Sequence, residues 1–169
     1  MYYPAEDSKL IEKWVGKKVG GRVLDIGTGT GILAFAAANR AEEVIGVDID
    51  PEAVEYANSK NTFNNVKFVT SDLFENVTGK FDWIMFNPPY LPPSKYDNGI
   101  DTTDNGVIDR FLREAKNYLK ENGKILILIS SLSKIQGDYG YNWNKLDELN
   151  VGFEKLYVYE LTPDTIKNS

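Results

Sequence analysis

The residues with the most distinctive chemistry are Asn87-Pro88-Pro89-Tyr90, which follow the apolar run Phe81–Phe86. Proline has no backbone N–H and a fixed φ, so the carbonyl groups of Pro88 and Pro89 are free to accept hydrogen bonds. Asn87 offers its side-chain carbonyl oxygen as a further acceptor, and Tyr90 adds a flat ring. The alternative is a purely structural role, as a rigid loop that ends a strand. The group nevertheless predicts a site that binds a planar –NH₂ group through two acceptors, with the ring against its face.

Strands and helices alternate along the chain, and this alternation predicts an α/β fold with a mostly parallel sheet and right-handed crossovers. The predicted strands are 22–26, 43–47, 66–69, 81–86, 124–129 and 153–160, and the predicted helices are 6–15, 32–39, 51–60, 107–120 and 142–149. The length of 169 residues suits a single domain. In that domain, residues 1–20 supply an N-terminal helix and residues 21–169 supply the core.

The composition excludes several kinds of site. The chain has no Cys and no His, which removes disulfides, thiol nucleophiles, a histidine base and metal sites built on those residues, so we expect no metal. The net charge of −6 argues against bulk binding to nucleic acid, which needs a basic surface. The N-terminus lacks the pattern of a signal peptide and the apolar runs are too short to span a membrane. We therefore expect a cytoplasmic protein.

Three acidic residues and a glycine-rich loop stand at the ends of predicted strands. Asp25 closes the first strand and leads into Gly27-Thr28-Gly29-Thr30-Gly31, while Asp48 and Asp72 follow the second and third strands. The carboxyl ends of parallel strands meet at one edge of the sheet, where ligands bind, so these residues should lie together. A single Asp at a strand end is often only a turn or N-cap residue, and we assign that role to Asp50.

The glycine loop narrows the choice of ligand. The dinucleotide-binding pattern G-x-G-x-x-G would need a glycine at position 32, which is Ile32 in this chain. Asp25 lies two residues before Gly27, where its carboxylate would repel a pyrophosphate but would suit a ligand that carries an ammonium group.

A strand that ends in an acidic residue followed by G-x-G-x-G resembles the first motif of class I S-adenosylmethionine (SAM) methyltransferases. The resemblance implies a three-layer, doubly wound, Rossmann-like sheet and SAM as the cofactor. It also implies a role for each residue of the cofactor site: Asp25 faces the methionine ammonium group, Gly27 and Gly29 let the ligand approach the backbone, Asp48 accepts from the ribose hydroxyls, Asp72 accepts from the adenine amino group, and Leu73 packs on the adenine ring.

The Asn-Pro-Pro-Tyr segment resembles the signature of methyltransferases that act on a planar nitrogen, and it places Asn87 against both cofactor and substrate. The Asn87 side-chain oxygen and the Pro88 carbonyl would polarise the two N–H bonds and favour a pyramidal nitrogen, with Tyr90 covering the substrate's face. Positive charge develops on that nitrogen in the transition state. Preorganised acceptors therefore stabilise the transition state more than they stabilise the bound substrate. The methylated nitrogen becomes acidic and can lose its proton later, so no general base is needed in advance.

The N-terminal segment Tyr2–Ser8 resembles that of the single-domain release-factor glutamine methyltransferases of archaea and eukaryotes, in the HemK/PrmC group. The resemblance implies that Ser8 contacts the cofactor. Asp104–Phe111 resembles a glycine-rich segment of the same family, although Thr102-Thr103 stand where that family often has paired glycines. The implied reaction is N5-methylation of the glutamine in the Gly-Gly-Gln loop of a class-1 release factor.

Two other functions stay open from the sequence. N-methylation of an adenine or guanine amine in RNA or DNA uses the same four residues, but the acidic chain has no added recognition domain, which makes nucleic acid the weaker candidate. A SAM-binding protein without turnover is the third hypothesis, and the intact Asn87 and Tyr90 argue against it.

The resemblance also bears on partners and on the C-terminal strands. Eukaryotic relatives use a small activator subunit, and an activator is a hypothesis here because Val44, Ile45 and Phe68 lie near the expected sheet edge.

The class I sheet usually ends in a seventh, antiparallel strand. Only Leu161–Ser169 follow the sixth predicted strand, and Pro163 interrupts them. We therefore expect the final antiparallel strand to be short or missing.

Overall fold

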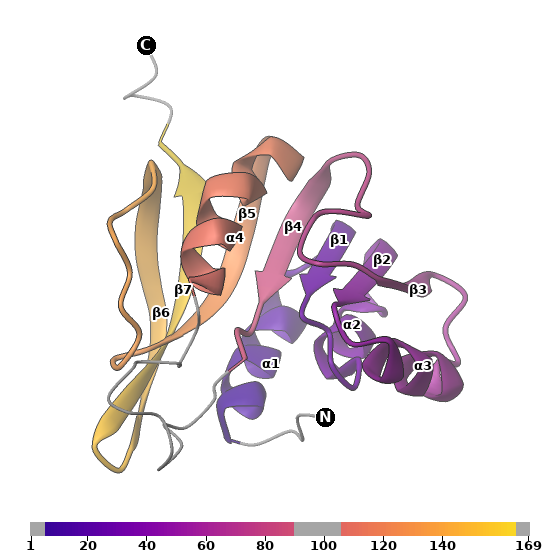
Figure 1. Cartoon of the computed structure of the whole chain (residues 1–169), viewed down its shortest axis with the longest axis horizontal. Coiled ribbons are helices and arrows are strands. Elements are labelled where there is room, and N and C mark those ends of the chain that lie inside the picture. Colours follow the sequence, from indigo (N-terminus) through magenta and orange to yellow (C-terminus); the bar gives the residue numbers. More distant parts are fainter. Residues whose placement is uncertain (1–5, 90–105, 165–169) are drawn as a thin grey trace.

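The structure is a computed structural model that describes residues 6–89 and 106–164 (Figure 1). These residues form a seven-stranded sheet in the order β3-β2-β1-β4-β5-β7-β6. The strands are β1 (Gly21–Ile26), β2 (Ala41–Asp48), β3 (Val66–Thr70), β4 (Phe81–Phe86), β5 (Leu119–Ser130), β6 (Tyr141–Val151) and β7 (Glu154–Pro163). The helices are α1 (Glu6–Lys18), α2 (Ile32–Ala37), α3 (Pro51–Lys60) and α4 (Val107–Ala115), and a short 3₁₀ helix, η1, covers Lys116–Tyr118.

The sheet lies between two hydrophobic cores, which makes the three layers that the sequence predicts. One core includes residues of α1, α2 and α3, and the other includes residues of α4 and the segment after β3 (Figure 1). The strand β4 contributes to both, because Trp83 and Met85 pack in the first core while Ile84 and Phe86 pack in the second. A strand buried on both faces is typical of the centre of a parallel sheet. The packing of β4 on both faces therefore fixes the position of Asn87, the residue that directly follows this strand.

The strands β1 to β5 pair in parallel, as predicted. The bounds of β1 to β4 lie within two residues of the predicted bounds. The helix α3 begins as expected, since the Asp50 side chain accepts a hydrogen bond from the Glu52 N–H at 2.9 Å and Pro51 occupies the first turn. The helix predicted over 107–120 ends earlier, at Ala115. β5 already begins at Leu119, which pairs with Phe81, and its register with β4 is irregular between Leu119 and Lys124, where Asn122 has a φ of 67°.

In the C-terminal part, the strand predicted over 153–160 is confirmed, but the helix predicted over 142–149 is wrong. The segment 142–149, predicted as a helix, belongs to strand β6, and the predicted sixth strand 153–160 belongs to β7. The antiparallel strand that we expected to be short or missing is therefore β7 itself, which is ten residues long and lies between β5 and β6.

A bulge explains why the strand β6 looks helical in sequence. The register shifts between Lys145 and Asp147, which changes the face on which alternate side chains lie. Before the bulge Tyr141 packs in one core, and after it Leu149 packs in the other. The two-residue alternation of a strand is thus broken in the middle of the segment.

The apolar residues that motivated the activator hypothesis are mostly internal. Val44 and Phe68 are buried in the first core, and Ile45 packs against the second core. The edge strand β3 exposes Val69 instead, at 40%. No helix in the described part of the chain is long and apolar enough to cross a membrane.

Candidate active site

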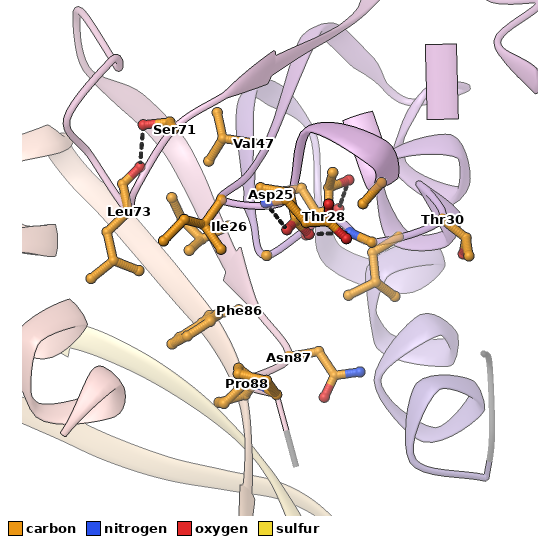
Figure 2. A pocket seen from close by; sticks show the side chains of 18 of the residues that line it. Asp25, Ile26, Thr28, Thr30, Val47, Ser71, Leu73, Phe86, Asn87 and Pro88 are labelled. Atoms are coloured by element: carbon orange, nitrogen blue, oxygen red, sulfur yellow. Dashed lines mark hydrogen bonds between the residues drawn. The ribbon is translucent and has the colours of Figure 1, made fainter. Parts of the chain in front are cut away.

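A cavity of about 330 Å³ lies where the carboxyl ends of β1, β2, β3 and β4 meet, and Figure 2 shows the side chains that line it. Every predicted site residue within the described ranges lines this cavity. These residues are Ser8, Asp25, Gly27, Gly29, Asp48, Asp72, Leu73, Asn87, Pro88 and Pro89. Tyr90, Tyr2–Ala5 and Leu91–Asn105 lie outside the described residues, so their predicted roles stay predictions.

The glycine loop after β1 turns sharply at the base of the cavity. Gly27 and Gly29 have φ values of 66° and 55°, in the left-handed region that glycine adopts without a steric penalty. The Thr28 N–H donates to the Val47 carbonyl at 2.8 Å, which fixes the loop to strand β2. The loop therefore presents backbone without Cβ atoms to the cavity, as close approach of a ligand requires.

Asp25 is a buried acid at this loop, with only 1% of its surface exposed. The Thr28 hydroxyl donates to its carboxylate at 2.7 Å, as the dashed contact in Figure 2 shows. Burial raises the pKa of Asp25 to about 7, and the nearby Asp48 charge adds to this effect, while the Thr28 hydrogen bond opposes it. A cation beside Asp25 would reverse the effect of burial, so this carboxyl group suits an ammonium ligand.

Asp48 at the end of β2 holds the glycine loop from the other side. One of its oxygens accepts from the Gly29 N–H at 2.8 Å, and the other accepts from the Asp50 N–H at 3.0 Å. Each carboxylate oxygen can accept more than one hydrogen bond, so Asp48 keeps acceptor capacity toward the cavity while it anchors the loop.

Asp72 follows β3 and forms an ion pair that the sequence did not predict. The Arg110 guanidinium, from helix α4, lies 2.8 Å from the Asp72 carboxylate and 3.3 Å from its backbone carbonyl. Next to it, Leu73 is buried and has a φ of 51°, an uncommon value for a residue with a side chain. The Ser71 hydroxyl donates to the Leu73 carbonyl at 2.8 Å, which helps to hold this turn.

Asn87 and Pro88 close the cavity at the end of β4 (Figure 2). The Asn87 side-chain N–H₂ donates to the Ser8 hydroxyl of helix α1 at 3.3 Å. Its carbonyl oxygen, Oδ1, is buried, and none of the described residues donates to it. An acceptor left in this state costs about 1–3 kcal/mol, so this oxygen is suited to accept a hydrogen bond from an N–H group of a ligand.

Sequence reasoning missed two side chains that bind the predicted acids of the site, Thr28 on Asp25 and Arg110 on Asp72. Thr28 stands three positions after Asp25, the spacing at which a hydroxyl in a turn reaches a preceding carboxylate, and this signal was available. Arg110 gave no local signal, because its contact with Asp72 depends on where α4 packs relative to β3.

Comparison with known sequences adds three findings. The family model described as "Methyltransferase small domain" matches residues 6–147. A proposed protein N5-glutamine methyltransferase of Methanocaldococcus jannaschii is 46% identical over 94% of this chain and 89% of its own length. A release factor glutamine methyltransferase of Haemophilus influenzae is 34% identical over 63% of this chain, which spans only 45% of that protein.

Among solved structures, a chain of the E. cuniculi Mtq2–Trm112 complex superposes with a TM-score of 0.71 at 24% identity. The match covers 96% of this chain and 98% of that one. The complex methylates the translation termination factor eRF1. At this identity the likeness shows a shared fold.

Proposed function

Because this chain belongs to the methyltransferase small-domain family, we propose that it methylates the side-chain amide nitrogen of a glutamine in a protein chain release factor. The enzyme takes the methyl group from SAM. The observation that carries the choice of an –NH₂ acceptor is the buried Asn87 oxygen, to which none of the described residues donates and which stands at the end of β4 beside Pro88.

The residues that line the cavity suit SAM in charge, and the glycine loop suits its close approach. Asp25 would bind the ammonium group, Asp48 the ribose hydroxyls, and Asp72 with Leu73 the adenine. The absence of Cβ atoms at Gly27 and Gly29 would let the ligand approach the loop. When bound, SAM supplies an electrophilic methyl group on a sulfonium centre.

Asn87 and Pro88 would act on the acceptor. The Asn87 Oδ1 atom and the Pro88 carbonyl each accept one N–H of the glutamine amide, which orients the nitrogen and concentrates its lone pair on one side. The positive charge that develops on this nitrogen would be stabilised by both acceptors, which directly follow a strand, β4, that is buried on both faces.

The choice of glutamine rests on similarity as well as geometry, since two acceptors for an –NH₂ group would also suit a nucleobase amine. The M. jannaschii relative is named for glutamine N5-methylation and matches nearly the whole chain. The H. influenzae relative is named for release factors. Both names favour an amide over a base.

A tritium-transfer assay with labelled SAM tests the proposal. The acceptors are a class-1 release factor, the same factor with the glutamine of its Gly-Gly-Gln loop replaced by alanine, and separately tRNA, rRNA and DNA. We expect label in the intact factor and none in the alanine variant. Label in nucleic acid alone would overturn the proposal in favour of base methylation.

A small activator subunit is part of this proposal. Support comes from the E. cuniculi neighbour, which was solved as a two-protein complex, and from the open edge at β3 with its exposed Val69. Adding a subunit of this kind to the purified chain should raise turnover. A chain that is monodisperse and fully active alone would count against it.

The affinity for SAM should depend on pH because of Asp25. Its pKa is raised to about 7 by burial, so below that pH the carboxyl group is neutral and must release a proton before it can pair with an ammonium group. The affinity should fall about tenfold per pH unit below pH 7. It should also fall above about pH 8, where the ligand's amino group loses its proton. Calorimetric titration across this range measures the profile.

The variant Asp25→Asn is the control for the pH profile. It keeps the shape of the side chain but cannot titrate, so the acidic limb of the profile should disappear and the affinity should be low throughout. An unchanged acidic limb in this variant would assign the titration to another group.

Arg110 should support adenine binding through Asp72. The pair is about 40% exposed on both sides, and exposed ion pairs contribute about 0.2–1 kcal/mol. Arg110→Ala should therefore weaken SAM binding by about twofold to fivefold, with turnover at saturating cofactor unchanged. Arg113→Ala, on the exposed side of the same helix, is the matched control. Equal effects of both variants would point to general charge and not to Asp72.

A further inference from the structure

The hydrogen bond between Ser8 and Asn87 joins two parts of the chain that are 79 positions apart. Ser8 is only 1% exposed, and it lies in the first turn of helix α1. The same helix is fixed to the core by Ile11 and Val15, which are fully buried. The Ser8 oxygen therefore stands at a defined place beside the end of β4.

The two ends of the Asn87 carboxamide have opposite hydrogen-bonding character, and only one of them suits an –NH₂ substrate. With its nitrogen donating to Ser8, the group leaves Oδ1 as the acceptor, and this oxygen is buried with no donor among the described residues. If the carboxamide turned over, its N–H₂ group would meet the N–H₂ group of the substrate, and two donors cannot bond to each other.

We infer that Ser8 is a positioning residue that keeps the Asn87 oxygen available to the acceptor amide. The inference rests on the proposed function and differs from a contact between Ser8 and the cofactor, which the sequence resemblance implies. The hydroxyl accepts the hydrogen bond of the Asn87 nitrogen, the one that this side chain makes among the described residues. Ser8 acts through Asn87 and makes no contribution of its own to the reacting nitrogen.

The variants Ser8→Ala and Ser8→Thr separate this role from others. Alanine cannot accept the hydrogen bond, whereas threonine keeps the hydroxyl. Without this hydrogen bond, the orientation of Asn87 that exposes its oxygen to the acceptor loses its support. We expect Ser8→Ala to lower kcat about tenfold with the Kd for SAM changed less than about twofold, and Ser8→Thr to stay within about threefold of wild type. Ser59→Ala, an exposed serine on α3, is the matched control.

A second measurement does not depend on any substrate. In protein labelled with ¹⁵N-asparagine, the side-chain amide signals of Asn87 are identified by their loss in Asn87→Ala. Ser8→Ala should shift these signals and speed their exchange with solvent about tenfold, because the hydrogen bond is gone. Ser8→Thr should leave them in place.

The outcomes separate the alternatives. A Kd for SAM that rises in Ser8→Ala while kcat at saturation is retained would overturn the inference in favour of a cofactor contact. A lower melting temperature with unchanged Asn87 signals and unchanged kcat would reduce Ser8 to a structural residue and also overturn it. If the wild-type chain does not methylate a release factor, the proposed function fails. The amide signals and the Kd then still decide the role of Ser8, with kcat measured on whichever acceptor takes label.

Discussion

Replacing Asn87 with alanine should lower turnover by about 10²–10³-fold, the loss seen when one preorganised polar group is removed from a transition-state site. The Asn87 oxygen is buried and without a donor among the described residues, so its hydrogen-bonding capacity is available to the acceptor. Alanine removes this acceptor and leaves the Pro88 carbonyl as the single partner of the amide. The nitrogen would then be held at one hydrogen and would sample unproductive orientations.

The affinity for SAM separates this effect from damage to the site. The glycine loop and the acids at the ends of β1 and β2 make no hydrogen bond to the Asn87 side chain among those described, so the Kd of Asn87→Ala should stay within about threefold of wild type. Asn144→Ala, on the exposed face of β6, is the matched control. Turnover near the wild-type rate in Asn87→Ala would rule out the mechanism in which Asn87 and Pro88 both accept from the amide.

Replacing Asp48 with alanine should weaken SAM binding about 100-fold, the second largest effect that we expect. The carboxylate has two tasks, because it would accept from the ribose hydroxyls and it already accepts from the Gly29 and Asp50 N–H groups. Hydrogen bonds to a charged group contribute about 1.5–3 kcal/mol each. Losing them would release the glycine loop from β2 as well as remove the ligand's partner.

Calorimetry with Asp48→Ala, Asp48→Asn and Glu42→Ala measures this prediction. Asparagine keeps one acceptor oxygen and should lose less affinity than alanine. Glu42 is an exposed acid on the same strand, so its replacement should change the affinity little. Unchanged binding in Asp48→Ala would take Asp48 out of the cofactor site.

The cavity could be predicted from sequence because its residues follow from one rule of topology. Each of the acids stands at the end of a predicted parallel strand, and such ends meet at one edge whatever the details of packing. The rule needs the order of strands and helices but not their exact bounds. It therefore tolerated the early end of helix α4 and the longer β5.

The parts that could not be predicted depend on contacts between distant segments. Strand β6 was not predicted because of the bulge between Lys145 and Asp147, since no local residue indicates where the buried face of a strand will change. The partner of Asp72 came from α4, and the partner of Asn87 came from α1. A hydroxyl or guanidinium group finds such partners only after the sheet and its helices have assembled.

The position of β7 has a consequence for the chain as it is synthesised. β7 follows β5 and β6 in the sequence, yet it lies between them in the sheet. Until residue 161 has left the ribosome, the apolar strand Ile125–Ile129 has an open edge on the side where β7 will pair. Such an edge is a template for pairing with other chains. This edge of β5 is therefore covered only when β7 inserts, so a strand that comes later in the sequence than both of its neighbours protects the sheet from pairing with other chains.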